Sequence, residues 1–227
     1  DDNANATAIT IDSAENVIIG ASSFDQGGFS SAATGINVHG LSPLVLCKET
    51  DTNIRGYVGV AGSNMYVMTP DATNLYIGTN DAARMVIDST GAVTMPAQPA
   101  FLIGSAANQD NIPTGTPKTV VFGFEIFDQN ADVSTTTFTA PVTGKYLLTT
   151  TARVDIIDTA ASYYRSSIYT SNRTYNGIII DPNFTADLSY LSLSTTTLAD
   201  MDAGDTAYVG ITQVGGTAQA DIVGSSD

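Results

Sequence analysis

The sequence predicts an all-β protein. Charged residues make up only 14% of the 227 residues, so the polar surface must come mainly from Thr, Ser, Asn and Gly, which are typical of short strands joined by turns. The stretch from Tyr146 to Ile156 alternates in period two, as expected of a half-buried antiparallel strand. This alternation places six residues on one face, namely Tyr146, Leu148, Thr150, Ala152, Val154 and Ile156. A hydrophobic content of 43% is sufficient for a folded core.

The first part of the chain contains short apolar segments that end at turns. Ile9–Gly20 and Met85–Met95 both predict a strand, an Ile-Asp-Ser turn and a second strand, and the Asp side chain can accept hydrogen bonds from nearby N–H groups. Further short strands are expected at Leu44–Cys47, Gly56–Val60, Asn64–Met68 and Asn74–Gly78, with a surface loop at Gln26–Gly35. Such strands bury too little apolar surface to offset chain entropy alone. We therefore expect a β-rich, intertwined shaft or collar that is completed by other chains.

A domain boundary is predicted at Met95–Pro99, where two prolines in four positions interrupt strand and helix alike. The predicted domains are residues 1–96 and 97–227. Longer and more aromatic strands follow at Thr119–Phe127, Tyr146–Ile157, Tyr163–Thr170, Leu188–Ser194 and Thr206–Val214. They predict a sandwich or jelly roll, in which Pro141 suits a strand entry and Gly144 is expected to adopt a backbone conformation closed to other residues.

Net charge and cysteine content exclude several classes of protein. The net charge of −15 argues against a nucleic-acid surface, because phosphate binding needs clustered Lys and Arg. No apolar run approaches the ~20 residues of a membrane-spanning helix, so no membrane insertion is expected. The single cysteine excludes an intrachain disulfide.

Three blocks of the second part carry a family resemblance. They are Val120–Asp128, then Phe138 with Gly144 and Tyr146, and finally Leu198–Asp205. In order and spacing these blocks resemble the globular head of complement C-one-q and its tumour-necrosis-factor-like relatives. The chain departs from the family pattern at Leu148 and Thr150, where aromatic residues are usual. The resemblance implies a ten-strand jelly roll in a compact homotrimer, with core or threefold-axis packing by Phe122, Phe124, Phe138, Gly144, Tyr146 and Leu148.

The first part resembles a different group of proteins. The segment Asn80–Val93, with its Ile-Asp-Ser turn, is similar to recurring segments of phage tail fibres and other virion appendages. A trimeric β-rich shaft followed by a trimeric jelly-roll head is a common arrangement in receptor-binding fibres. The two resemblances therefore imply the same stoichiometry.

Catalytic and metal sites have little support in the sequence. His39 is the only histidine and has no partner at a spacing that indicates zinc or a Ser-His-Asp relay, and Cys47 is expected to be a buried small hydrophobic residue. A polysaccharide-degrading site would need two paired carboxylates, which no motif indicates. Asp200, Asp202 and Asp205 are spaced closely enough to suggest a structural divalent cation, including one held between subunits. Otherwise, neither a cofactor nor a catalytic residue is expected.

A binding surface is predicted where tyrosine and arginine residues cluster, because both side chains combine large contact area with hydrogen bonding. Its candidate residues are Tyr163, Arg165, Tyr169, Asn172, Arg173 and Tyr175. The loop Ser171–Gly177 is expected to present Arg173 and Tyr175 outward. Packing of these tyrosines into the core or onto the trimer axis is the alternative.

Together these features predict a structural, non-enzymatic, trimeric virion appendage that acts outside the cell. Its head is expected to bind a host cell-surface receptor, such as a glycan, or a neighbouring virion protein. The alternatives are a secreted or cell-surface adhesion module with a complement-like head and a polysaccharide-degrading spike.

Overall fold

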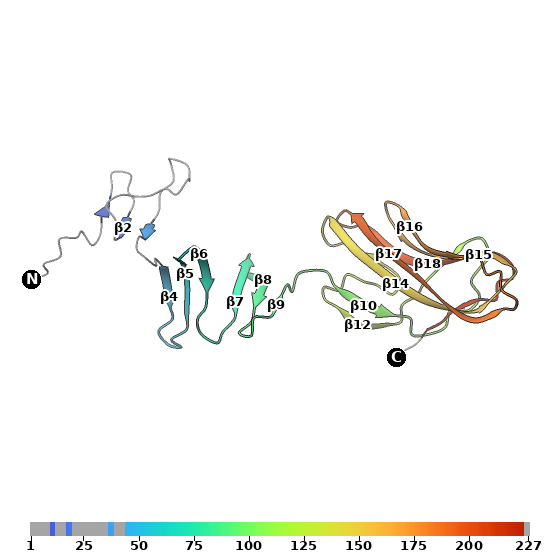
Figure 1. Cartoon of the computed structure of the whole chain (residues 1–227), viewed down its shortest axis with the longest axis horizontal. Coiled ribbons are helices and arrows are strands. Elements are labelled where there is room, and N and C mark those ends of the chain that lie inside the picture. Colours follow the sequence, from blue (N-terminus) through green and yellow to red (C-terminus); the bar gives the residue numbers. More distant parts are fainter. Residues whose placement is uncertain (1–9, 12–16, 20–35, 39–43, 225–227) are drawn as a thin grey trace, which may run out of the picture. The chain divides into compact units, whose positions relative to one another are not determined.

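The computed structural model describes residues 10–11, 17–19, 36–38 and 44–224, and every regular element among them is a β-strand (Figure 1). The chain divides into two compact units, Asp1–Pro96 and Ala97–Asp227. The division falls within the proline-containing segment Met95–Pro99. The predicted loop Gln26–Gly35 lies outside the described residues.

The first unit consists of three small sheets of three strands each. Their strands are β1 (Thr10–Ile11), β2 (Val17–Ile19) and β3 (Ile36–Val38), then β4 (Leu44–Lys48), β5 (Arg55–Ala61) and β6 (Asn64–Met68), then β7 (Leu75–Thr79), β8 (Ala82–Ile87) and β9 (Val93–Thr94). Within each group the strands pair in chain order, and only β2 and β3 pair in parallel. The predicted short strands are therefore present, and they form separate small sheets.

Asp88 organises the turn between β8 and β9. Its Oδ1 accepts hydrogen bonds from the backbone N–H groups of Thr90 and Ala92 at 2.8 and 3.0 Å, and from the Thr90 hydroxyl at 2.7 Å. These bonds, led by the one from the Thr90 hydroxyl, hold the pKa of the Asp88 carboxyl below its usual range. The prediction from the Ile-Asp-Ser turn is confirmed here, whereas the corresponding Asp12 lies outside the described residues.

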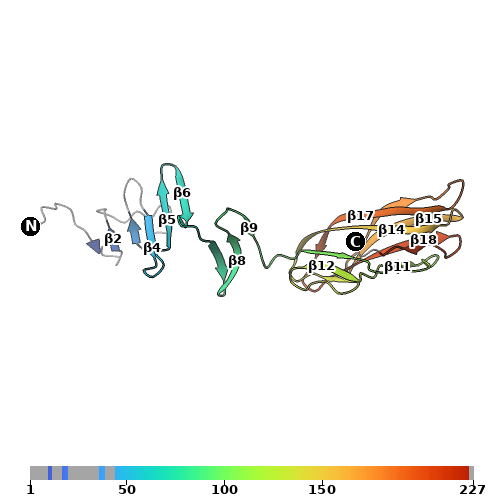
Figure 2. The same ribbon diagram turned by 90° about the horizontal axis from the view of Figure 1, so that it is seen from below.

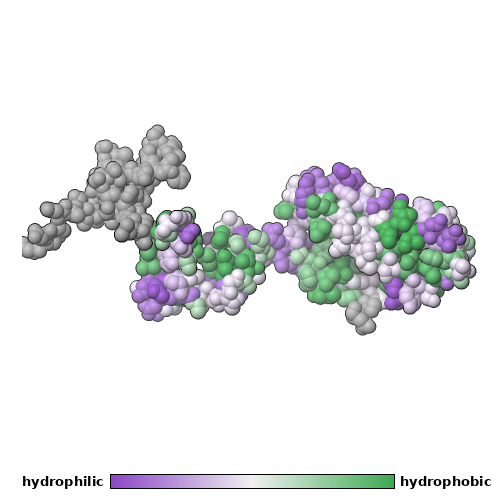
Figure 3. All heavy atoms as spheres, in the orientation of Figure 1, coloured by the Kyte–Doolittle hydropathy of each residue, from purple (hydrophilic) through white to green (hydrophobic). Residues whose placement is uncertain are grey.

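No residue between 44 and 96 is buried. The strands of this unit expose their apolar side chains, as the green surface of the unit illustrates (Figure 3). Cys47 on β4 is likewise exposed as a free thiol, so the expectation that it is buried was wrong. The reason is that no second layer covers β4 in the part of the chain that the structure describes.

The second unit, the head, contains ten strands from residue 97 to residue 224. They are β10 (Phe101–Gly104), β11 (Pro117–Thr119), β12 (Phe124–Asp128), β13 (Phe138–Thr139), β14 (Gly144–Ile157), β15 (Ala161–Thr170), β16 (Thr174–Ile180), β17 (Leu188–Met201), β18 (Thr206–Gly215) and β19 (Asp221–Ile222). The longest pairing joins β14 to β17, from Gly144 opposite Met201 to Ile157 opposite Leu188. Both strands run side by side along the head in the two views (Figures 1 and 2).

The head is a jelly roll. One sheet has the order β17-β14-β19, and the other has the order β11-β18-β15-β16 with β13 also paired to β18. From β13 to β19, successive strands alternate between these two sheets except at the β15–β16 hairpin. This crossing pattern is that of a double-sheet jelly roll. A separate pair, β10 with β12, lies beside them.

The core lies between the two sheets. Val154 and Leu193 from one sheet and Tyr164 and Ile211 from the other have no exposed surface. The sheets are also joined inside the core by a hydrogen bond of 2.7 Å from the Thr195 hydroxyl to the Ser166 hydroxyl oxygen. Both hydroxyls are therefore satisfied without water, as buried polar groups require.

Most of the predicted packing residues contact this core, with two differences. Phe138 and Leu148 are buried, and Phe122 and Tyr146 pack against the core. Phe124 instead covers Gly104, where an added Cβ would lie 2.4 Å from the Phe124 ring. Gly144 does not have a positive φ, and an added Cβ there would make only an ordinary contact with Tyr146. The special backbone conformation expected of Gly144 is therefore wrong.

Two predicted strands differ from those observed. The predicted strand Thr119–Phe127 is divided in two. Thr119 ends β11 and Phe124 begins β12, and residues 120–123 between them belong to no strand. In β14 the predicted alternation holds up to Asp155, but Ile156 has a φ of 54° and is 49% exposed, whereas Ile157 is fully buried. The left-handed backbone at Ile156 turns its side chain out of the core face. The predicted burial of Ile156 was therefore wrong.

We predict that Ile156→Asn stabilises the head. A β-branched residue in the left-handed region is strained by about 1–2 kcal/mol, whereas Asn tolerates that region. The matched control is Ile179→Asn on β16, because Ile179 is similarly exposed at 56% and does not have a positive φ. Urea unfolding should give a higher unfolding free energy for Ile156→Asn only. An equal or opposite effect of the two changes would contradict the role of the backbone.

We also predict that the stability conferred by Asp88 depends on pH. Its pKa is lowered in the folded chain, so its contribution is complete above the ordinary value of about 3.9 and is lost as the pH falls through the lower folded value. Asp88→Asn keeps an acceptor oxygen but removes the charge. The variant should unfold more easily than the parent at neutral pH and equally easily at strongly acidic pH, as thermal unfolding across this range will show. A difference that does not change with pH would refute the charge effect.

Candidate binding face

The outer face of the sheet β11-β18-β15-β16 carries a cluster of tyrosine and arginine residues. Along β15 the side chains of Tyr164, Ser166 and Ile168 are buried, so the alternating residues between them point away from the core. We call this surface the tyrosine–arginine face. On β15 and β18 it consists of partly exposed residues, with the buried Ser167 and Thr212 on the same side of the strands. The partly exposed members are Tyr163, Arg165, Tyr169 and Tyr208.

The register between β15 and β18 brings these residues together. Arg165 lies opposite Thr212, and Tyr169 lies opposite Tyr208. The two tyrosine rings stack with centroids 4.9 Å apart and planes 9° apart. They form a flat aromatic surface at one end of the face.

Gly210 makes room for this aromatic pair. A Cβ at Gly210 would lie 2.8 Å from Cε2 of the Tyr169 ring and 3.3 Å from the Pro117 Cβ. The ring therefore lies over the glycine, close to the backbone of β18. Any larger residue at this position would displace the ring of Tyr169.

Arg165 provides the positive charge of the face. Its guanidinium lies 6.0 Å from the centroid of the Tyr163 ring, a cation–π geometry. Its Nε and the hydroxyl of Thr212, a residue only 4% exposed, are buried without a hydrogen-bond partner among the described residues. Nearby, the Ser167 hydroxyl donates to Asn176 Oδ1 at 3.0 Å. A guanidinium beside aromatic rings suits a ligand that offers both acceptors and an apolar surface, such as a sugar ring or a peptide.

The other predicted binding residues lie elsewhere. Asn172 and Arg173 are in the turn between β15 and β16, where Asn172 Nδ2 donates to Asp205 Oδ2 at 2.7 Å. Tyr175 on β16 lies opposite Ile168 on β15 and packs against the core. The predicted loop Ser171–Gly177 is thus a shorter turn followed by a strand, and outward presentation of Tyr175 was wrong. Its alternative, packing into the core, describes Tyr175 correctly.

The three aspartates proposed for a cation do not converge. Asp200 forms an ion pair with Lys145, which lowers the pKa of the Asp200 carboxyl, chiefly through the hydrogen bond. Asp205 Oδ2 accepts from the Asp202 N–H at 2.8 Å and closes the turn before β18. No group of three His, Cys, Asp or Glu residues suited to a metal occurs in the part of the chain that the structure describes. Within a single chain these carboxylates serve the turn and an ion pair, and a cation held between subunits stays a prediction.

Sequence reasoning missed Ser167, Tyr208 and Thr212 as members of the face. The alternation in Thr206–Val214 would have placed Tyr208, Gly210 and Thr212 on one side of a strand. Their proximity to Arg165 depends on the register of β18 against β15, which the sequence does not reveal. His39 lies outside the described residues, and among those described no helix is long and apolar enough to cross a membrane.

Comparisons with known proteins find a likeness among solved structures. The sequence matches no protein-family profile and no curated protein. Among solved structures, the globular domain of a zebrafish complement 1qA protein is similar, with 18% sequence identity and a TM-score of 0.41. The match covers 56% of this chain and 93% of that one. At this level of similarity, the jelly-roll assignment rests on the strand order of the head itself.

Proposed function

We propose that this chain is a non-enzymatic attachment protein that assembles as a homotrimer, with residues 1–96 forming the shaft and the head presenting the tyrosine–arginine face. The absence of any buried residue between 44 and 96 carries this proposal. Strands whose apolar side chains are at best partly buried gain little of the burial that stabilises β-structure. Further chains would supply the missing cover.

The sheet β4–β5–β6 is apolar on both faces. On one face Val45, Val58 and Val67 form a continuous row across the three strands, each about half exposed at 55, 45 and 50%. On the other face Leu46, Tyr57 and Met68 form a second row. A sheet with one wet face would need polar residues there. Both faces of this sheet therefore favour contact with neighbouring layers.

Other copies of the same chain are the simplest source of those layers, since closed symmetric assembly is the rule for soluble oligomers. The outer face of β14 and β17 offers a further contact, where Leu147 and Leu198 lie opposite each other and are 72 and 63% exposed. Three copies are favoured by the resemblance of the head sequence to complement-like trimers.

Placement on a virion is favoured by the similarity of Asn80–Val93 to tail-fibre segments. Three heads on one shaft would present three tyrosine–arginine faces. Their combined avidity allows each contact with a receptor or a neighbouring virion protein to be weak. Rigid attachment surfaces of this kind need no catalytic group.

We predict that the purified chain has the mass of three 23.6-kDa chains in sedimentation equilibrium at micromolar concentration. Val58→Asp, at the centre of the valine row, should shift this mass to that of a single chain, because an unpaired buried charge is strongly unfavourable. Ser63→Asp in the exposed β5–β6 turn adds the same charge and should leave the trimer intact. A monomeric parent chain, or a Val58→Asp variant that remains trimeric, would refute assembly through this sheet.

We further predict that Arg165→Met weakens binding of the trimer to an array of cell-surface glycans by at least about tenfold, in line with arginine contacts at interface centres. Arg153→Met is the matched control, since Arg153 lies 5.9 Å from the Tyr190 ring centroid in the same cation–π arrangement on the other sheet. It should bind like the parent chain. Equal losses in both variants would show that the tyrosine–arginine face is not the contact.

A further inference from the structure

The sheet that carries the tyrosine–arginine face has no acidic residue in its strands. None of β11, β13, β15, β16 and β18 includes an Asp or Glu, although the chain carries 23 of them. In the other sheet each strand has one aspartate, namely Asp155 on β14, Asp200 on β17 and Asp221 on β19. The strands that form the tyrosine–arginine face are therefore free of negative charge.

The carboxylates in the turns next to this sheet are engaged locally. Asp158 lies just before β15 and Asp181 just after β16, and each accepts from a backbone N–H two residues further on, at 2.8 and 3.1 Å. Asp205, just before β18, accepts from the Asp202 N–H at 2.8 Å. At physiological ionic strength the Debye length is about 8 Å, so more distant acidic groups act only weakly on this face.

Arg165 differs from Arg153 in having no carboxylate partner. Their guanidinium groups lie at similar distances from a tyrosine ring centroid, 6.0 Å to Tyr163 and 5.9 Å to Tyr190. Arg153 is also ion-paired, with its Nε 3.3 Å from Asp155 Oδ1. Arg165 has no such pair among the described residues, and its two terminal nitrogens form no hydrogen bond there. Since a guanidinium binds a carboxylate through two parallel N–H groups, we expect a ligand to supply this carboxylate.

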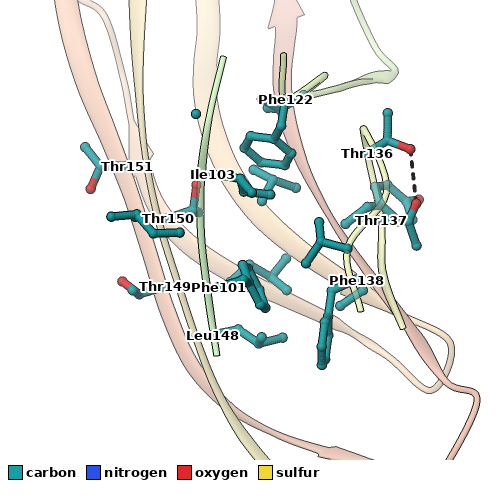
Figure 4. A pocket seen from close by; sticks show the side chains of 18 of the residues that line it. Phe101, Ile103, Phe122, Thr136, Thr137, Phe138, Leu148, Thr149, Thr150 and Thr151 are labelled. Atoms are coloured by element: carbon teal, nitrogen blue, oxygen red, sulfur yellow. Dashed lines mark hydrogen bonds between the residues drawn. The ribbon is translucent and has the colours of Figure 1, made fainter. Parts of the chain in front are cut away.

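The outer face of β14 and β17 offers a contrast, because its hydroxyl groups are paired within the chain. Thr149 bonds to Thr196 at 2.9 Å, and Thr151 bonds to Ser194 at 3.0 Å. Figure 4 shows the side chains of Thr149 and Thr151 directed away from Phe138. The aspartates of this sheet would also repel an anion. An anionic ligand therefore suits the tyrosine–arginine face better.

A further polar group lies between Arg165 and the stacked tyrosines. Asn176 on β16 is exposed and lies opposite Ser167, whose hydroxyl donates to its Oδ1. The Asn176 Nδ2 has no hydrogen-bond partner among the described residues. Arg165 and Tyr169 are four residues apart on β15, or about 13 Å at about 3.3 Å per residue. One sugar ring is shorter than this, so an oligosaccharide is needed to contact all three groups.

We propose that the tyrosine–arginine face binds an acidic polysaccharide in which uronic acid residues alternate with neutral sugars. The carboxylate of one uronic acid pairs with Arg165, and the apolar face of a nearby sugar ring covers the Tyr169–Tyr208 pair. Hydroxyl groups of the sugars accept from Asn176 Nδ2. This inference rests on the attachment role proposed for the face, and it names the class of ligand.

Other anions match this face less well. Nucleic acids and heavily sulfated polysaccharides need clustered cations, whereas Arg165 is the only basic residue on the face. Lys118 on β11 lies opposite the buried Ile211 and donates to the Asp110 carbonyl. An extended peptide binds best at a strand edge, but β15 and β18 have neighbouring strands on both sides. A single terminal acid sugar would reach Arg165 and leave the stacked tyrosines uncovered.

Matched oligosaccharides test the proposal with the full 227-residue chain. The probes are fluorescent hexasaccharides of hyaluronan, chondroitin and heparosan, in all of which glucuronic acid alternates with a neutral sugar. Each is compared with the same probe after its carboxylates are reduced to alcohols. Anisotropy should show at least one acidic probe binding at least about tenfold more tightly than its reduced form, as expected of a hydrogen bond between charged groups. No saturable binding of any acidic probe, or equal binding of acidic and reduced forms, would overturn the proposal.

Variants of the two arginines locate the carboxylate contact. Arg165→Met should remove the preference for the acidic probe, whereas Arg165→Lys keeps the charge without the two parallel N–H groups and should retain part of it. Arg153→Met is the matched control and should retain the whole preference. An unchanged preference in both Arg165 variants, or an equal loss in Arg153→Met, would overturn the assignment of Arg165.

Two further probes distinguish other ligands. Hexaglutamate that binds as tightly as the acidic hexasaccharides would show that charge alone is recognised, and binding of sialyllactose in their place would identify a terminal acid sugar. Either result would overturn the proposal. The attachment role would survive such a failure if Arg165→Met still weakened binding to the glycan array. If the array result were also unchanged, the attachment role of this face would fail as well.

Discussion

Burial of apolar side chains between two β-sheets is the interaction on which the head depends. Alternating residues of β14 and β17 meet those of β15 and β18, so residues such as Val154, Leu193, Tyr164 and Ile211 are removed from water. The strands between residues 44 and 96 carry apolar residues as well, but no second layer covers them among the described residues. The same physical requirement therefore gives a buried core in the head and underlies the proposal that the first unit assembles with other chains.

Because the core uses only one face of each sheet, the outer faces can serve other purposes. The tyrosine–arginine face combines a stacked aromatic pair with unpaired polar atoms on Arg165 and Thr212. The opposite sheet bears Leu147 and Leu198 in an exposed pair. These two surfaces differ in chemistry, and this difference underlies the separate roles proposed for them, ligand binding and contact with another subunit.

The sequence predicted the strands well where alternation was long or turn chemistry was specific. Tyr146–Asp155 alternates as expected, and Asp88 accepts the hydrogen bonds that its turn motif indicated. The errors arose where non-local structure intervenes. Tyr175 belongs to a strand that packs on the core, and the left-handed backbone of Ile156 reverses which isoleucine is buried. Cys47 is exposed because no second layer covers β4 among the described residues.

The sequence by itself determined the all-β class, the two-part organisation and the chemistry of individual turns, because strand periodicity and turn preferences are local properties of the chain. Only the tertiary structure decided which strands are neighbours and in which register. That register places Arg165 beside Thr212 and Tyr169 against Tyr208. Strand pairing joins residues that are far apart in the chain, and it is selected by the packing of whole sheets. The candidate sites could therefore be located only in the folded protein.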